Sequence, residues 1–308
     1  MRYDRLGFPI PPEFDGAAAA LRPSGPARRA GASGRGKRLV VIGLLAAVIG
    51  PGLFAPAILP VVREFVVGWS VRRAFQGEAR GQSAAAVSDV GRALAWSDDP
   101  QLTVDLLCWR SMLRLDTRDA DGAGADAGRA IDLAPTSARP RRLRALVNVV
   151  LGRPDAAIAD AEAAVELSVV GDPEALNHRA YVRALVGRDL PGALADIEAA
   201  LAGETEPPPE LLDTRGYVLH LLGRHQDAID QLNLAIAAAM SRRRDVIGRA
   251  RGGDRLGAAR DLRALDRDLA VMHHHRGLAC RAVGLDGQAE QDFAFAEKKG
   301  YDPSRGVM

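Results

Sequence analysis

Pairs of alanines seven residues apart recur along most of the 308-residue chain. They are Ala86/Ala93, Ala123/Ala130, Ala157/Ala164, Ala193/Ala200, Ala228/Ala235 and Ala289/Ala296. The first alanines of successive pairs lie 37, 34, 36, 35 and 61 residues apart, so the last interval is one period plus an insertion of about 27 residues. A fixed period of this length is typical of repeat proteins, in which each unit stacks on its neighbours because it cannot bury its apolar face alone.

The residues between the paired alanines predict a helix in every unit. An apolar or small residue stands four positions after each first alanine, and positions i, i+4 and i+7 share one helical face. Small side chains on that face let a neighbouring helix approach closely. An aspartate also recurs three positions after the first alanine in five of the six units, at Asp89, Asp126, Asp160, Asp196 and Asp292. We interpret these aspartates as a solvated face of the helix.

Glycines mark the turn inside each unit. Gly81, Gly152, Gly187, Gly223 and Gly284 each precede an alanine pair. Glycine just beyond a helix end adopts the left-handed conformation that caps the helix, so each glycine separates a first helix from a second. Gly216 instead falls inside a predicted first helix, where glycine costs about 1 kcal/mol relative to alanine; close helix packing is its expected reason.

Together these features closely resemble the tetratricopeptide repeat (TPR) family. The best unit runs from Leu212 to Ala235, the last unit matches nearly as well, and Ala130–Pro135 reads like the family's helix-ending signature. The resemblance covers roughly residues 66–305, with departures at Ser111 and Pro191. It implies an all-α fold, a helix-turn-helix solenoid over 63–308 that forms a right-handed superhelix of four to six well-formed units, whose first helices line a concave surface.

The period fails between residues 241 and 257, a segment with six arginines and four glycines. We expect an extended helix, a flexible loop and then an unusually long first helix of the last unit, with Leu262, Leu265, Leu269 and Met272 on one face. The arginines could bind phosphates or an acidic partner. A solvated loop, with Asp245 and Asp254 nearby, is the favoured interpretation.

The N-terminal region predicts a tail and a membrane anchor. Residues 1–38 carry eight basic and three acidic side chains, net +5, and their Pro, Gly and Ser content predicts disorder. Residues 39–62 follow without a charge and, at about 1.5 Å per residue, form a helix long enough for a ~30 Å hydrocarbon core. Two alternatives are a buried core helix and a signal peptide cleaved near Ala55–Ala57. We expect an uncleaved, single-pass transmembrane helix.

Flanking charge predicts the orientation of this helix. Arg28, Arg29, Arg35, Lys37 and Arg38 precede it, whereas Arg63, Arg72 and Arg73 follow it. The excess upstream predicts that the N-terminus is cytoplasmic and that the body lies across the membrane, which is the periplasm if the cell is a double-membrane bacterium.

Motifs for catalysis, cofactors or metals are not recognisable. Gly31–Lys37 resembles a phosphate-binding loop, but Arg38 stands where Ser or Thr should bind magnesium and no strand precedes it. His273, His274 and His275 point about 100° apart on a helix and cannot converge on one ion. The chain lacks HExxH and GxSxG, and its two cysteines exclude a disulfide scaffold. We therefore expect no enzyme, cofactor or metal site, and no nucleic-acid partner, because the densest basic run adjoins the apolar stretch.

The resemblance implies that partner proteins or extended peptides bind the concave face. The positions that would face them are Asn177, Tyr181, Asp213, Tyr217, His220, His274 and Arg281. The family's clamp for carboxyl termini is unsupported, because Lys298 and Lys299 are the only lysines outside the tail. The first hypothesis is a membrane-anchored scaffold without catalysis. The second is an assembly or regulatory subunit of a membrane enzyme, with contacts in the anchor at Ala46 and Gly50.

Overall fold

The computed structural model describes the backbone of residues 51–302 and the side chains of residues 58–302. These residues form helices joined by short turns: α3 (Pro51–Ala79), α4 (Ser83–Trp96), α5 (Pro100–Asp116), α6 (Ala120–Leu133), α7 (Ala138–Val150), α8 (Pro154–Glu166), α9 (Pro173–Val186), α10 (Leu190–Leu201), α11 (Pro209–Leu221), α12 (His225–Arg251), α13 (Arg255–Ala282) and α14 (Asp286–Lys298). The predicted tail, 1–38, lies outside the described residues. So does the first half of the predicted span, 39–62, whose second half, Pro51–Val62, falls in α3.

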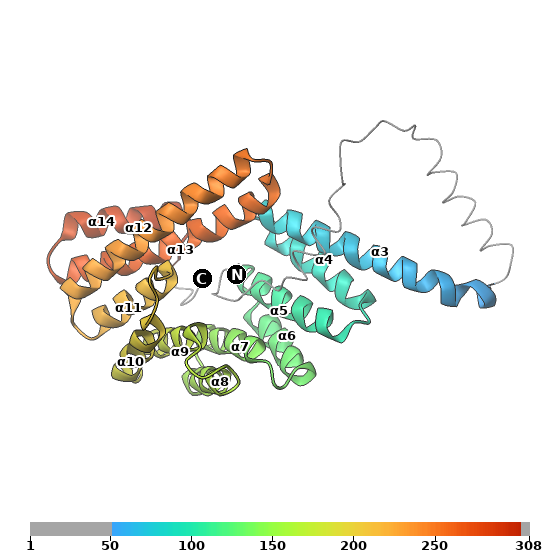
Figure 1. The fold of residues 1–308 in the computed structure, drawn as a ribbon, viewed down its shortest axis with the longest axis horizontal. Coiled ribbons are helices and arrows are strands. Elements are labelled where there is room, and N and C mark those ends of the chain that lie inside the picture. The colour runs from blue at the N-terminus through green and yellow to red at the C-terminus, as the bar shows by residue number, and fades with distance from the viewer. Residues whose placement is uncertain (1–50, 303–308) are drawn as a thin grey trace.

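Successive helices pair as antiparallel hairpins, and each pair packs on the next. Figure 1 shows the pairs in an arc, with α7 and α9 on the inside and α8 and α10 on the outside. Within the described residues there are six such pairs, the upper end of the expected four to six. No helix in this part of the chain is both long enough and apolar enough to cross a bilayer.

The paired alanines are the contact points between helices, as the sequence predicts. All twelve are at most 1% exposed. Close packing also explains Gly216, because a Cβ there would lie 2.6 Å from Cγ of Leu232. Gly277 meets Phe293 of the last pair in the same way, at 2.7 Å. A stripe of small residues therefore fixes the spacing of the two helices in each pair.

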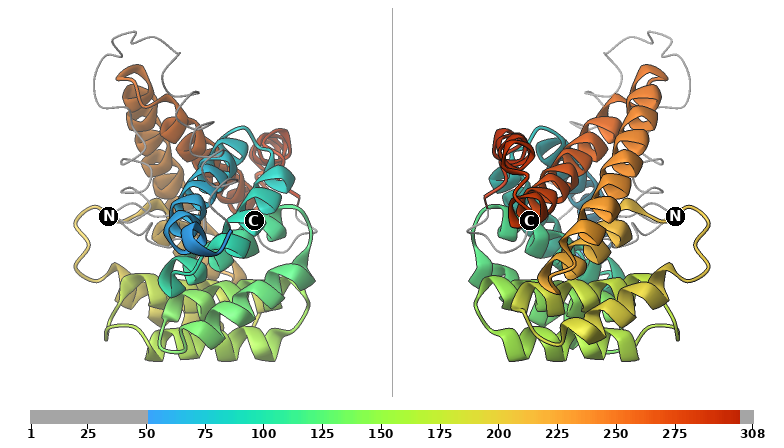
Figure 2. Two further views of the ribbon diagram at one scale, coloured as in Figure 1. Left: turned by 90° about the vertical axis from the view of Figure 1, so that its right-hand side faces the viewer. Right: turned by 90° about the vertical axis from the view of Figure 1, so that its left-hand side faces the viewer.

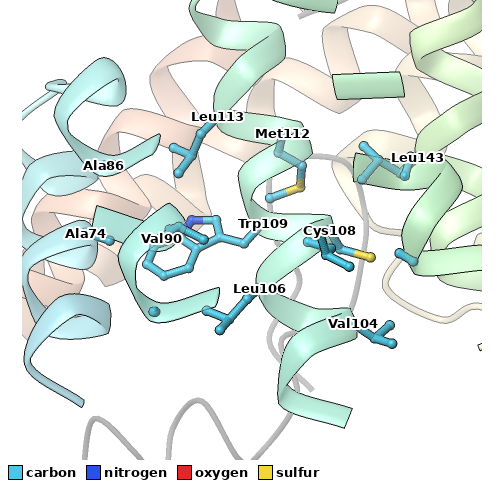
Figure 3. Close-up of a cluster of buried hydrophobic side chains, with 14 residues drawn as sticks. Ala74, Ala86, Val90, Val104, Leu106, Cys108, Trp109, Met112, Leu113 and Leu143 are labelled. Carbon is cyan, nitrogen blue, oxygen red and sulfur yellow. The ribbon is translucent and has the colours of Figure 1, made fainter. Parts of the chain in front are cut away.

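The first described pairs share a larger apolar cluster (Figure 3). Trp109 lies between α5 and the α3–α4 pair, near Ala74 and Val90, while Met112 lies on the side of α5 that faces Leu143 of α7. The indole Nε1 of Trp109 donates to the buried Glu78 at 3.1 Å, so this large side chain keeps its polar atom paired. Helix α5 thus joins the first helices α3 and α7 on its two sides into a continuous core.

The interpretation of the recurring aspartates as a solvated face is wrong. Asp89, Asp126, Asp160, Asp196 and Asp292 are all buried. In each pair an arginine of the first helix, sixteen or seventeen residues earlier, contacts the aspartate of the second; these arginines are Arg73, Arg110, Arg144, Arg179 and Arg276. In four of them Nε and an Nη donate to the two carboxylate oxygens, at 2.5–2.9 Å.

The remaining pair keeps the position but changes the chemistry. Gln231 of α12 occupies the place of the aspartate, and Arg215 donates to its Oε1 at 3.2 Å, sixteen residues away. The other units strengthen the contact instead: Arg114 donates to Asp126, Asn148 to Asp160 and Arg183 to Asp196. We name this series of first-helix to second-helix contacts the Arg–Asp ladder.

The expected flexible loop in the insertion 241–257 is also wrong. Helix α12 continues to Arg251 and α13 begins at Arg255, so the turn is only Gly252–Asp254. Apolar contacts among Val246, Ala258 and Leu265 bury one face of this hairpin. Its arginines pair across it, Arg243 with Asp266 at 2.9 Å and Arg249 with Asp261 at 2.6 Å. Sequence reasoning missed these partners because they lie on the other helix of the hairpin, beyond the turn.

The lengthened α12–α13 hairpin closes the arc. In Figure 2 it extends well beyond the other helix pairs. Arg260 of α13 donates to Glu78 of α3 at 3.0 Å, and Arg263 donates to the backbone oxygen of Ala79 at 2.8 Å. Arg267 contacts Asp116 at the end of α5 at 3.6 Å. The inner face of the solenoid is therefore bounded by contacts between its first and last described pairs, which the sequence did not predict.

Removing one ladder carboxylate should destabilise the whole solenoid. In an Asp126→Ala variant, Arg110 would lose the carboxylate that it shares with Arg114, and Arg114 would keep only the half-exposed Asp119. Breaking a buried pair costs about 3–5 kcal/mol, and because both arginines are partly exposed we expect roughly 2–3 kcal/mol. Urea unfolding followed by circular dichroism measures this difference.

The matched control is Asp227→Ala, which removes an aspartate half exposed on α12 and paired with Arg224. An exposed pair contributes about 0–1 kcal/mol. Equal losses in the two variants would contradict a structural role for the ladder.

Candidate functional site

Aromatic, imidazole and carboxylate side chains of α9, α11 and α13 lie close together. The ring of His275 stacks on Tyr217, with centroids 4.0 Å apart and planes 10° from parallel. Nδ1 of His275 lies 3.0 Å from Oδ1 of the buried Asp213. Burial, and then the nearby charge of Asp213, raises the pKa of both Tyr181 and Tyr217. The phenols of this region are therefore neutral hydrogen-bonding groups.

The segment that follows α14 contacts this group of side chains. Tyr301 lies against His274, with ring centroids 4.5 Å apart. Burial, followed by the proximity of Tyr217 and Asp213, raises the pKa of Tyr301. We name the set Tyr181, Asp213, Tyr217, His274 and His275 the inner cluster; Tyr301 packs against it.

Of the predicted site residues, four fall in the inner cluster: Tyr181, Asp213, Tyr217 and His274. Asn177 lies one turn before Tyr181 on α9, and its buried Oδ1 accepts no hydrogen bond from the described residues. Arg281 is exposed and covers the ring of Phe293 at 4.4 Å. His220 instead pairs with His225, with their Nδ1 atoms 3.2 Å apart.

The three consecutive histidines contact different groups, as helical geometry predicts. Nδ1 of His273 lies 2.6 Å from the ladder residue Asp292, His274 contacts Tyr301, and His275 contacts Asp213. Among residues 58–302, no group of three or more His, Cys, Asp or Glu side chains is arranged to hold a metal ion.

Further ion pairs join successive first helices. Arg139 of α7 donates to Asp105 of α5 at 2.8 Å, and Arg142 of α7 donates to Glu174 of α9 at 3.2 Å. His178 of α9 lies buried beside Arg142. Burial, and then the charge of Arg142, lowers the pKa of His178 to about 3. Burial, and then the electrostatic effects of His275 and Arg281, lower the pKa of His274 to about 4.

Arg118 and Asp302 form a contact that sequence reasoning missed. Arg118, in the turn between α5 and α6, donates to Asp302 at 3.1 Å, although 184 residues separate them. Arg118 is also five residues before Ala123, where the turn in most other units has glycine, and it shares the left-handed conformation (φ 65°) of those glycines. A residue with a side chain in this conformation costs roughly 1–2 kcal/mol. The absence of glycine at this turn was visible in the sequence. The contact of Arg118 with Asp302 was not, because the two residues are so far apart in the chain.

Comparisons with known proteins support a TPR-like fold. No family model and no curated protein matches the chain. A solved structure of PilW, titled a widely conserved type IV pilus biogenesis factor, is similar at 15% identity and a TM-score of 0.51, over 78% of this chain and 96% of that one. A TPR protein from Parabacteroides merdae (17% identity, 77% and 94% covered, TM-score 0.46) and one from Thermus thermophilus (21%, 63% and 98%, 0.49) are also similar.

The depressed histidine pKa values predict acid sensitivity. In the unfolded chain a histidine takes up a proton below about pH 6.5, whereas folded His178 and His274 stay neutral to about pH 3 and 4. The free energy of unfolding should therefore hold above pH 6.5 and fall as the pH drops from 6.5 to 4. Each histidine contributes at most about 1.4 kcal/mol per pH unit.

Urea unfolding at several pH values tests this expectation. A His178→Asn variant should show a shallower pH slope than the unmodified chain, and His178→Asn with His274→Asn a shallower slope still. A slope that stays the same in both variants would contradict the assignment.

Proposed function

We propose that the chain is a membrane-anchored, TPR-like scaffold that binds partner proteins or extended peptides on its inner face, without catalysis. The observation that carries the proposal is the inner cluster. It combines flat aromatic and imidazole rings, which give large contact areas at small entropic cost, with the buried carboxylate of Asp213. The ladder and the small-residue stripes hold the helices that present these groups.

Peptide recognition suits this surface better than small-molecule chemistry. The rings come from three successive first helices, α9, α11 and α13, so they extend along the solenoid and do not converge on one reacting atom. Asn177 adds a carboxamide oxygen without a partner among the described residues, which a peptide N–H could supply. The likeness to PilW concerns the fold alone.

The membrane anchor, residues 39–62, remains part of the proposal, with the N-terminus in the cytoplasm and the body outside it. The start of α3 supports it: Leu59 and Val61, inside the span, and Phe65, just beyond it, are all exposed, and Phe65 is 71% exposed. Trp69 follows, with the guanidinium of Arg73 over its ring at 4.8 Å. Exposed aromatic residues with nearby arginines beyond an apolar span are typical of a membrane interface.

Photo-crosslinking in the native cell tests the inner face. A photoreactive amino acid at Arg281, exposed near His274, should capture partner proteins. The matched control places the same photoreactive amino acid at Val170, which is fully exposed in the α8–α9 turn, and it should capture far fewer partner proteins. Both positions are exposed, so neither substitution threatens the fold. Equal patterns at the two positions would count against binding at the inner face.

Membrane fractionation tests the anchor. Leu45→Arg with Val48→Arg should move the full chain from the membrane to the soluble fraction, because each arginine at the centre of a span costs about 2.5–3.5 kcal/mol. Val169→Arg with Val170→Arg, on an exposed turn, controls for added charge and should leave the chain in the membrane. Retention of the Leu45/Val48 variant in the membrane after carbonate washing would contradict the anchor.

A further inference from the structure

The short segment after α14 packs against residues of other helices. Gly300 has a left-handed backbone (φ 84°) that turns the chain away from α14. The next two residues, Tyr301 and Asp302, are in neither helix nor turn. Each makes a contact far from α14: Tyr301 with His274 of α13, and Asp302 with Arg118 between α5 and α6. Two adjacent residues therefore connect the last helix pair to the second described pair.

The contacts have the character of ligand recognition. The Tyr301 ring is packed against an imidazole, and its surroundings contain Tyr217 and Asp213 of the predicted binding face. The Asp302 carboxylate receives a guanidinium. An aromatic anchor beside a charged contact is a common pattern in peptide binding.

The backbone conformation of Arg118 indicates that its contact with Asp302 has a role. Five equivalent turns use a glycine for the left-handed position, at Gly81, Gly152, Gly187, Gly223 and Gly284. The second pair alone among those described has a side chain there, and that side chain binds Asp302. A strained residue retained where glycine would fit points to a use for its side chain.

We propose that Tyr301–Asp302 is a built-in ligand that occupies the partner site, and that external partners carry the same feature: an extended segment with an aromatic residue followed directly by an acidic one. This inference rests on the proposed scaffold function and adds the class of peptide that the site accepts. A tethered segment has an effective concentration in the millimolar range, so a partner must compete with it or bind several sites at once.

Binding of a synthetic peptide to the purified full chain tests the inference. The probe is a fluorescent peptide with the sequence of residues 299–306, and its control replaces the tyrosine and aspartate with alanine and asparagine. A Tyr301→Ala, Asp302→Ala variant should bind the probe at least tenfold more tightly than the unmodified chain, because its own segment no longer competes. The control peptide should bind neither protein. Equal binding of the probe to both proteins, or to neither, would overturn the proposal.

Arg118→Gly provides a variant that should not unfold, because it restores the residue that the turn conformation favours. Added to the Tyr301→Ala, Asp302→Ala variant, it should weaken probe binding several-fold without lowering the melting temperature. The matched control is Arg224→Ala, which removes an exposed arginine next to Gly223 in the equivalent turn between α11 and α12. It should leave binding unchanged. An equal loss of probe binding in the Arg118→Gly and Arg224→Ala variants would show that binding depends only on the net charge of the chain.

Hydrogen–deuterium exchange gives a readout independent of the probe. In the otherwise unmodified chain, Arg118→Gly should speed exchange in a peptide that spans residues 299–304, and Arg224→Ala should not. Unchanged exchange in Arg118→Gly would mean that the segment is a fixed part of the fold. Crosslinks at Arg281 without any probe binding would leave the scaffold function intact and remove only the built-in ligand.

Discussion

The Arg–Asp ladder is the interaction on which the rest of the structure depends. An aspartate buried at the interface of two helices is tolerable only because a guanidinium from the partner helix meets both of its oxygens. The bidentate geometry fixes the rotation and height of the second helix relative to the first. The paired alanines fix their separation. Repeated along the chain, these two constraints set the position of each first helix, and α7 and α9 lie on the inner side of the arc (Figure 1).

The inner cluster depends on this placement. Tyr217 and His275, whose rings stack, come from two different helix pairs, and Tyr181, near Tyr217, comes from a third. These side chains come together only because the pairs stack in a constant way. Closure of the arc by Arg260 and Arg263 then limits how a partner reaches the inner face. The site is thus a product of repetition and of one departure from it, the lengthened α12–α13 hairpin.

Sequence reasoning located most of the fold because the repeats encode it locally. The alanine stripes, the turn glycines and the tight approach at Gly216 all follow from contacts within one helix pair. The aspartates were misread because a position on a helical face does not reveal whether a cation lies opposite. The signal was present: Arg144 precedes Asp160 by sixteen residues, and an arginine precedes the aspartate by the same spacing in other units. The recurrence of both residues at a constant spacing would have identified the pair.

By itself the sequence determined the period, the helix pairs and the small residues that set their spacing, since these rest on residues no more than one repeat apart. Only the tertiary structure decided that the insertion is a helical hairpin, that Arg260 reaches Glu78, and that Asp302 reaches Arg118. Those contacts join residues more than 180 positions apart. Their geometry depends on the accumulated curvature of all the intervening pairs, which no local pattern records.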